Sequence, residues 1–366
     1  MPGSAAAGQS PTLVVEDDPI TRLLQVLLDP ATPRERHAAF ADFMAHDEPD
    51  FGGWCERVRA RAAGLYPADV RLVASESELR ANIGNADALV VEAMQVARQD
   101  LDAAGRLKAV QKFGVTLRNI DIAACAEKGI KVLTLRRRAN ISCAEHAFAL
   151  MLMLARRVHE FNGMVSVERL ERAGYAYRPY DRRHTPNGNW ARIAGLRTLN
   201  GSTIGIIGLG EIGREIALRA AAFGMRILYF QRTRLADAEE AFLQARYAPL
   251  GVLLQESDWV VPQLPAGSST RHFLDSARIA GMKRGAAIVN VSRADLIERK
   301  ALIGALSSGH LGGFALDTPY EAPGRPDDEL LGLRNVIMVP HLAGSPRSNA
   351  LKDMEELVVG LAKALS

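Results

Sequence analysis

Short apolar runs recur along the second half of the chain, and most are separated from the next by a segment with helical spacing of apolar positions. Runs rich in Val, Ile and Leu, without alternation of polar residues, are typical of strands buried on both faces of a parallel sheet. The pattern therefore predicts an open, doubly wound sheet. Its predicted strands are residues 203–207, 226–230, 259–264, 286–291, 313–316 and 336–339.

The first half of the chain shows a second alternation of the same kind, which predicts further parallel βαβ units. Its predicted strands are 13–15, 70–73, 88–91 and 110–115. Helical periodicity predicts helices over 21–28, 35–44, 54–65, 144–157, 211–223 and 348–366. The expected fold class is therefore α/β, with two Rossmann-like doubly wound parallel-sheet domains.

Length and composition agree with two folded domains. With 366 residues the chain exceeds the roughly 100 to 200 residues of an ordinary domain. Apolar residues make up 48% and charged residues 24%, which excludes collagen-like, coiled-coil and disordered classes. Lys and Arg number 45 against 42 for Asp and Glu, so we expect no nucleic-acid partner.

The cysteines and the apolar runs restrict the cellular setting. Cys55, Cys125 and Cys143 share no close spacing, which indicates neither a disulfide framework nor a zinc or redox pair, and we expect no metal site. The longest apolar run, 147–155, is far shorter than the roughly 20 residues of a membrane helix. Residues 1–11 lack the pattern of a signal peptide and are expected to form a loose tail. The expected location is the cytoplasm, without membrane association.

A glycine motif directly follows the predicted strand 203–207. Gly208, Gly210 and Gly213, with Glu211 and Ile212 between them, form GxGxxG at the start of a predicted helix. In this context the glycines permit a tight turn, close approach of the backbone to a pyrophosphate, and helix packing on the strand. The motif therefore predicts a dinucleotide site, and a glycine-rich turn without a ligand is the alternative.

The next strand ends in residues that bear on the choice of dinucleotide. An acidic side chain there would accept hydrogen bonds from the adenosine ribose. This chain instead has Gln231, Arg232, Thr233 and Arg234. Guanidinium groups pair with phosphate, so the sequence favours NADP(H), with NAD(H) as the second cofactor. The alternative is that these arginines only face solvent.

Two further stretches complete a set of motifs: Asn290 to Asp295, which contains Arg293, and Pro340 to Gly344, which contains His341. Together with the glycine motif and Asp317, they resemble the D-isomer-specific 2-hydroxyacid dehydrogenase family from about residue 110 to the C-terminus. Reduction of a 2-oxo acid requires a cation for the carboxylate and a proton donor for the oxygen, and arginine and histidine suit these roles. The resemblance implies an NAD(P)-dependent oxidoreductase that interconverts a 2-oxo acid and a D-2-hydroxy acid, with Arg293 as substrate anchor and His341 as acid/base.

The resemblance also assigns residues around the substrate and the nicotinamide. It implies that Asp317 holds the nicotinamide carboxamide, and a turn cap is the alternative role for this residue. It implies further cofactor contacts from Leu264, Pro265, Thr270 and Val291. Backbone N–H groups of Val115 and Thr116 are expected to bind the substrate carboxylate, although Thr116 stands where the family has glycine.

One departure from the family concerns the proton donor. Family members usually place Glu five residues after the aspartate, where it pairs with the catalytic histidine, but that position is Ala322 here. Either Glu321 reaches His341 by a different backbone path, which we take as the working hypothesis, or His341 lacks a carboxylate partner. The second case would favour a non-catalytic, dinucleotide-sensing binding protein on the same fold.

The resemblance finally implies a domain arrangement. A substrate domain, 1–143 completed by 342–366, would be interrupted by a dinucleotide-binding domain, 144–341, with a cleft between them that closes on a small 2-oxo acid. A homodimer is expected, with the segment 167–189 as an interface element. The three arginines at 136–138 are either a solvated charge run or the binding site for a second anionic group of the substrate.

Overall fold

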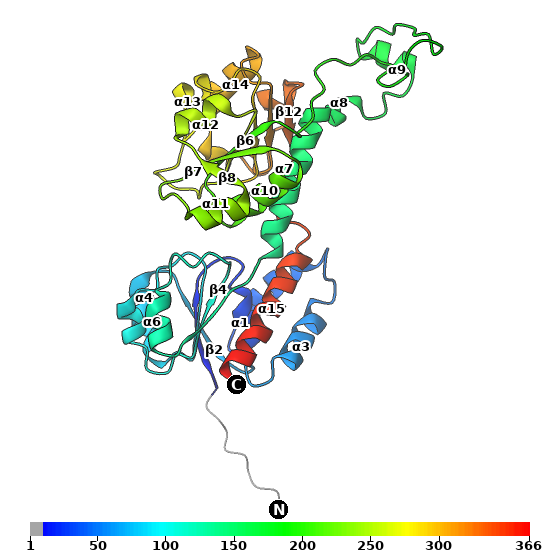
Figure 1. Ribbon diagram of the computed structural model, residues 1–366. Coiled ribbons are helices and arrows are strands. Elements are labelled where there is room, and N and C mark those ends of the chain that lie inside the picture. Colours follow the sequence, from blue (N-terminus) through cyan, green and yellow to red (C-terminus); the bar gives the residue numbers. More distant parts are fainter. Residues whose placement is uncertain (1–9) are drawn as a thin grey trace, which may run out of the picture. The chain divides into compact units, whose positions relative to one another are not determined.

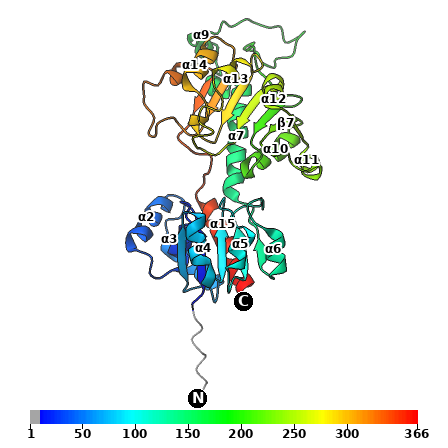
Figure 2. The same ribbon diagram turned by 90° about the vertical axis from the view of Figure 1, so that its left-hand side faces the viewer.

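A computed structural model describes residues 10–366, so the predicted N-terminal tail lies largely outside the described residues. The chain divides into two compact units (Figures 1 and 2). Unit 1 comprises the described residues up to Ser142 together with Gly344–Ser366. Unit 2 comprises Cys143–Ala343.

Unit 1 is built on a five-stranded parallel sheet with the strand order β2-β1-β3-β4-β5. The strands are β1 Thr12–Glu16, β2 Asp69–Val73, β3 Ala88–Val91, β4 Ala109–Lys112 and β5 Lys131–Leu133. The predicted strand 110–115 ends earlier, at Lys112, because the chain turns into a loop there. The short edge strand β5 was not predicted, since its sequence has no long apolar run.

Helices cover both faces of this sheet. Alternate residues of β1 enter different cores: Leu13 and Val15 pack with α1, α3 and α15, whereas Val14 packs with α4 and α6. The C-terminal helix therefore belongs to unit 1 (Figure 1). The helices are α1 Leu23–Leu28, α2 Arg34–Met44, α3 Phe51–Arg61, α4 Glu76–Asn82, η1 Ile83–Asn85, α5 Arg98–Asp102, α6 Ile122–Glu127 and α15 Ser348–Leu365.

Unit 2 is built on a seven-stranded parallel sheet with the order β12-β11-β10-β9-β6-β7-β8. The strands are β6 Thr203–Ile207, β7 Arg226–Phe230, β8 Ala245–Tyr247, β9 Trp259–Pro262, β10 Ala287–Asn290, β11 Gly313–Leu316 and β12 Val336–Met338. The chain reverses its direction of travel across the sheet between β6 and β9, and ligands of open α/β sheets bind at such a switch point. Only β8 was not predicted.

Both faces of the second sheet are also buried. One core contains α7 and α10, and the other contains α12, α13 and α14 (Figures 1 and 2). The helices are α7 Arg138–Arg156, α8 Val158–Phe161, α9 Val167–Arg172, α10 Glu211–Ala222, α11 Asp237–Leu243, α12 Leu250–Glu256, α13 Ser276–Ala280, η2 Ala294–Leu296, α14 Arg299–Ser307 and η3 Glu329–Gly332. The predicted α/β class with two doubly wound parallel sheets is confirmed.

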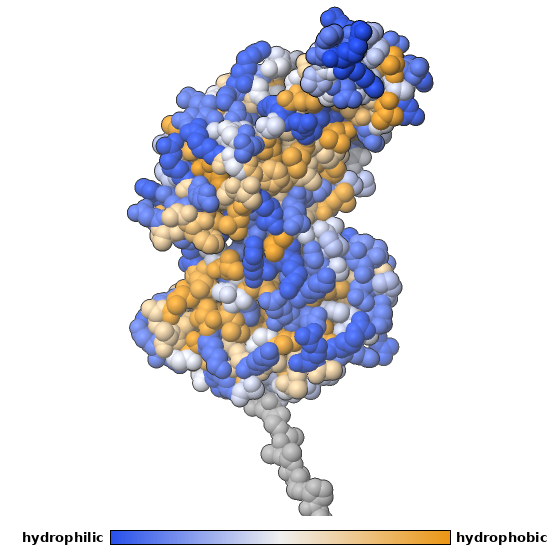
Figure 3. Space-filling model, turned by 45° about the vertical axis from the view of Figure 1, so that its right-hand side comes forward, coloured by the Kyte–Doolittle hydropathy of each residue, from blue (hydrophilic) through white to orange (hydrophobic). Residues whose placement is uncertain are grey.

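A long connection joins α8 to β6 and contains the predicted arm, 167–189. Apart from α9, the residues 162–202 form turns and irregular structure. On the face shown in Figure 3, strongly hydrophilic residues gather over this arm at the top of the view. Within residues 10–366, no helix is long and apolar enough to cross a membrane.

Candidate active site

The three glycines of the motif after β6 each meet a different geometric demand. Gly208 has φ +96°, and a Cβ there would lie 2.3 Å from the Gln263 carbonyl oxygen after β9. A Cβ at Gly213 would lie 2.3 Å from the Gly208 carbonyl oxygen, so α10 packs directly on the turn. A Cβ at Gly210 would meet nothing within 4 Å. The open space at Gly210 is where a pyrophosphate would approach the backbone.

The helix that starts at this turn fits a phosphate. Gly210 is the N-cap of α10, and no described side chain caps the first turn of this helix. The first N–H groups of a helix have no acceptor within the helix, and they carry the positive end of its dipole. Together with the room beside Gly210, they form the kind of cradle that binds a dinucleotide pyrophosphate. Glu211 and Ile212 are half-buried in this first turn.

Gln231, at the end of β7, is engaged by the protein itself. Its Oε1 accepts a hydrogen bond from the Leu209 N–H at 3.2 Å, and its Nε2 donates to the Thr233 carbonyl oxygen at 2.6 Å. The amide therefore ties the glycine-rich turn to the end of the neighbouring strand. This bracing function was not predicted from the sequence.

The two predicted phosphate-binding arginines differ in their surroundings. Arg234 donates from Nε and Nη2 to the two carboxylate oxygens of Glu240, both at 2.8 Å. Arg232 is exposed and forms no hydrogen bond or ion pair with residues 10–366. Of these two arginines, Arg232 can therefore bind an anion without first breaking an ion pair, whereas Arg234 cannot.

A chain of contacts holds Glu240 in place. The guanidinium of Arg234 lowers the pKa of Glu240 to about 2. Tyr229 donates its hydroxyl to Glu240 at 2.6 Å, and burial together with this carboxylate raises the pKa of Tyr229 to about 12. A similar pair joins Arg214 on α10 to Glu239 at 2.6 Å. Arg234 after β7 and Arg214 on α10 are thus both paired with carboxylates of α11.

Arg293 lies in a braced loop after β10. The buried side chain of Asn290 accepts from the Ser292 N–H and donates to the Arg293 carbonyl oxygen, both at 2.9 Å. Ser292 Oγ donates to the Leu264 carbonyl oxygen at 2.9 Å, which links this loop to the end of β9. The Arg293 side chain is exposed, and its Nη1 donates only to the adjacent Ser292 carbonyl oxygen among the described contacts. The loop is fixed, while most guanidinium donors remain available.

His341 follows β12 and has an exposed side chain. Its backbone has φ +57°, and its N–H donates to the Asp317 carbonyl oxygen at 2.8 Å. Asp317 itself directly follows β11 and is fully buried. Its carboxylate accepts from the N–H groups of Leu342, at 2.7 Å, and Ala343, at 3.1 Å. The Asp317 carboxylate therefore binds backbone groups of the protein. Its predicted contact with the nicotinamide carboxamide, which the family resemblance implies, stays a prediction.

The hypothesis that Glu321 reaches His341 does not agree with the geometry. Glu321 is exposed in the loop after β11, and no ion pair or hydrogen bond joins it to His341 in the described part of the chain. The nearby charge in that loop is Arg325, which pairs with Asp327 at 3.0 Å. Glu321 and Asp327 are exposed in this loop, whereas Asp328 is half-buried and pairs with Arg299 at 2.7 Å.

The remaining predicted cofactor residues border the same edge of the second sheet. Val291 is buried behind the Arg293 loop, and Leu264 is partly buried in the core beside β9. Pro265 and Thr270 lie in the following turn, where the Thr270 hydroxyl donates to the Pro265 carbonyl oxygen at 2.6 Å. Gln263, just before them, has a buried Nε2 without a partner in residues 10–366.

The predicted substrate loop follows β4 and lies in unit 1. Val115 is 42% exposed, whereas Thr116 is half-buried. The loop is attached to the chain after β5 by the Leu135 N–H, which donates to the Gly114 carbonyl oxygen at 2.9 Å.

Two of the arginines at 136–138 are neither a solvated run nor free for a second anion. Arg138 pairs with Asp353 at 2.9 Å and Glu356 at 2.8 Å on α15. Arg137 pairs with Glu92 at 2.7 Å, and its guanidinium lies 4.0 Å from the centre of the Phe113 ring. For Arg137 and Arg138, the predictions of a solvated charge run and of a site for a second substrate anion are therefore both wrong. The two residues form ion pairs that join separate elements of unit 1.

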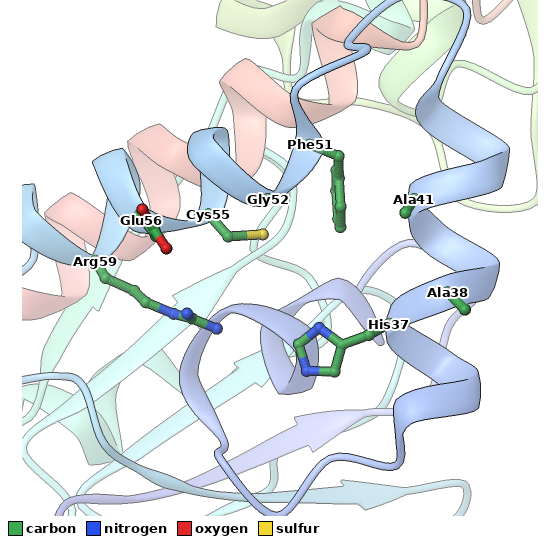
Figure 4. A pocket seen from close by; sticks show the side chains of 8 residues that line it. All are labelled: His37, Ala38, Ala41, Phe51, Gly52, Cys55, Glu56 and Arg59. Carbon is green, nitrogen blue, oxygen red and sulfur yellow. The ribbon is translucent and has the colours of Figure 1, made fainter.

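A separate pocket of about 350 Å³ lies between α2 and α3 in unit 1 (Figure 4). His37 projects into it from one helix, and Cys55 and Arg59 project from the other. Burial raises the pKa of the Cys55 thiol to about 11, so the thiol is not activated as a nucleophile. No predicted site residue lines this pocket.

Comparison with known proteins gives the same family over most of the chain. The model of the D-isomer specific 2-hydroxyacid dehydrogenase, NAD binding domain, matches residues 148–343. A glyoxylate reductase from Pyrococcus furiosus is 37% identical over 282 residues, which cover 77% of this chain and 80% of that protein. A D-3-phosphoglycerate dehydrogenase from Methanocaldococcus jannaschii is 35% identical over 272 residues, 74% of this chain and 48% of that protein. The crystal structure of a glyoxylate reductase from Paecilomyes thermophila, 25% identical, has a TM-score of 0.52 and covers 98% of this chain and 96% of that one.

The fold and the site together define a dinucleotide-binding oxidoreductase. The chain belongs to the D-isomer specific 2-hydroxyacid dehydrogenase family. It is an NAD(P)-dependent enzyme of the 2-hydroxyacid dehydrogenase and glyoxylate reductase type. The predicted family and enzyme class are confirmed, and the alternative of a non-catalytic sensing module is not supported.

Proposed function

We propose that this enzyme reduces a small 2-oxo acid to the D-2-hydroxy acid with NADPH. One observation carries the proposal: three loops with complementary chemistry follow strands β6, β10 and β12 at the same edge of one parallel sheet. They contribute the glycine cradle, the exposed guanidinium of Arg293 and the exposed imidazole of His341. In open α/β sheets this edge is where ligands bind.

In this proposal Arg293 binds the substrate carboxylate through paired N–H donors, a geometry that a guanidinium provides and an ammonium does not. His341 donates a proton to the substrate oxygen and becomes neutral. When bound, NADPH supplies the hydride that reduces the carbonyl carbon. The products are a 2-hydroxy acid and NADP⁺, and the imidazole regains its proton from solvent.

We further propose that unit 2 holds the dinucleotide and that unit 1 contributes the backbone N–H groups of Val115 and Thr116 to the substrate. This assigns 144–341 to the coenzyme and 1–143 with 342–366 to the substrate. The preference for NADPH rests on Arg232, because the position that binds ribose through a carboxylate in NAD enzymes is here the amide of Gln231.

The test is oxidation of NADPH, followed by its absorbance, with a panel of 2-oxo acids. Glyoxylate is the first substrate to try, since the relatives from Pyrococcus furiosus and Paecilomyes thermophila are named for its reduction. Pyruvate and a longer 2-oxo acid measure the size limit, and a 3-oxo acid serves as a control that lacks the vicinal carboxylate. Turnover of 2-oxo acids alone is expected. Absence of turnover with every member of the panel would refute the proposal.

We also propose a homodimer in which the arm 167–189 takes part. Val165, just before the arm, is 81% exposed. Tyr177 in the arm forms an edge-to-face ring contact with Trp190, just after the arm, with ring centroids 6.0 Å apart. An exposed apolar side chain such as that of Val165 is common at interfaces. Mass measurement in solution tests this, and a Val165→Asp variant should shift a dimer toward monomer. A parent protein that is already monomeric at micromolar concentration would contradict the proposal.

A further inference from the structure

The turn that carries His341 is built almost entirely on one buried residue. The Asp317 carbonyl oxygen accepts from the His341 N–H at 2.8 Å, and its carboxylate accepts from the next two N–H groups, those of Leu342 and Ala343. Three consecutive backbone donors therefore reach Asp317, and the first of them, the His341 N–H, is shared with the Val339 carbonyl oxygen at 3.0 Å. Because the residue is 0% exposed, water does not compete for these contacts.

This attachment is needed because His341 adopts an unfavourable backbone conformation. Its φ of +57° lies in the left-handed region, which is sterically unfavourable for a residue other than glycine. Such a conformation persists only where surrounding contacts determine it. The contacts to Asp317 do so here, and they fix the direction in which the imidazole leaves the backbone.

A histidine from a distant part of unit 2 meets the same carboxylate. His146, on α7, places its Nε2 3.2 Å from Asp317 Oδ1, which is within ion-pair distance but without the angles of a hydrogen bond, and its side chain is 21% exposed. A buried carboxylate requires a compensating partner, and an imidazole N–H or imidazolium provides one. Although burial alone would raise it, the His146 imidazole and the two backbone N–H groups hold the pKa of Asp317 below its ordinary value. The carboxylate thus stays a strong acceptor for the turn.

We propose that His146 and Asp317 act as a positioning pair that fixes the backbone of His341 for proton transfer. His146 keeps the carboxylate ionised and in place, and the carboxylate orders the turn. Neither residue exchanges a proton with the substrate. The inference rests on the proposed role of His341 and adds two residues that govern where its imidazole lies.

The experiment compares His146→Leu, which removes the ring nitrogens, with His146→Gln, which retains an N–H donor. His159→Leu is the matched control, because His159 is a second half-buried histidine of unit 2 near a carboxylate, with Nε2 3.9 Å from Glu160 Oε1. Each variant is assayed for kcat with a 2-oxo acid, for NADPH affinity by fluorescence titration and for melting temperature. The kinetic isotope effect is measured with NADPH deuterated at the transferred position.

We expect His146→Leu to lower kcat roughly 10- to 100-fold, the scale of a misplaced catalytic group, with little change in NADPH affinity. The isotope effect should rise, because the chemical step becomes slower relative to substrate and product steps. A loss of folded protein would reduce kcat without changing the isotope effect. His146→Gln should recover most of the activity, and His159→Leu should resemble the parent enzyme.

Two outcomes separate this inference from the role proposed for His341. Full activity in His341→Gln would overturn the acid role and the positioning pair with it. An inactive His341→Gln together with parental kcat in His146→Leu would overturn the positioning pair alone. A loss in His146→Leu that leaves the isotope effect unchanged would also overturn it, since the effect would then be on folding.

Discussion

If the enzyme prefers NADPH as proposed, removal of Arg232 should make it less selective between NADPH and NADH. Arg232 is the exposed arginine after β7 to which the described structure gives no carboxylate partner, so its guanidinium can face a 2′-phosphate directly. A hydrogen bond to a charged group contributes about 1.5 to 3 kcal/mol, and the lower end applies to an exposed side chain. In Arg232→Ala we therefore expect kcat/KM with NADPH to fall about tenfold, with NADH unaffected.

Arg234 provides a graded comparison. It forms two 2.8 Å hydrogen bonds to Glu240, so it must leave that partner before it can contact a phosphate. Arg234→Ala should therefore reduce the NADPH/NADH ratio less than Arg232→Ala does. Glu240→Gln, which removes the competing charge while keeping an acceptor for Tyr229, should raise the ratio.

The assay is kcat/KM for both cofactors at fixed ionic strength, because contacts between exposed charges are screened by salt. Arg246→Ala, which removes an exposed arginine from the edge strand β8, controls for net charge. A parent enzyme that prefers NADH would refute the reasoning. An equal loss with both cofactors in Arg232→Ala would also refute it, since the 2′-phosphate would then not be the group recognised.

Further substitutions test the site and the glycine turn. Arg293→Ala should nearly abolish reduction of 2-oxo acids while the fluorescence titration with NADPH stays parental, and equal turnover would remove Arg293 from the site. Glu321→Gln should leave the falling alkaline limb of the pH profile of reduction in place, because no contact joins this exposed carboxylate to the proton donor in the described chain. Ala322→Glu should move that limb to higher pH, since a neighbouring carboxylate favours the protonated imidazole. Gly213→Ala should destabilise the protein by about 1 to 3 kcal/mol, because its Cβ would lie 2.3 Å from a carbonyl oxygen, whereas Gly251→Ala, with nothing within 4 Å, should not; chemical denaturation measures both.

Much of the architecture could be predicted because its signals are local. Strands buried on both faces require continuous apolar runs, so β6, β7 and β11 were recognised at their observed bounds. The glycines at 208 and 213 are likewise required by a turn in which a Cβ would lie 2.3 Å from a carbonyl oxygen. The strands β5 and β8 were not predicted, because each has only three residues and lies at a sheet edge, where polar side chains reach solvent.

Other features depend on residues far apart in the sequence. Helix α7 begins at Arg138, although the apolar periodicity starts at 144, because the Asp353 carboxylate accepts the backbone N–H of Arg138 at 3.0 Å. The pairing of Arg234 with Glu240 is equally a matter of how α11 packs.

The sequence by itself determined the fold class, the dinucleotide motif and the arginine and histidine that follow two of the strands. Only the tertiary structure decided which of the polar side chains form hydrogen bonds or ion pairs with other parts of the protein. Glu321 remains in solvent, and the buried Asp317 meets His146 and the turn of His341. The physical reason is that apolar periodicity and glycine geometry act over a few residues. The partner of a buried charge is set by the packing of elements that the sequence does not place side by side.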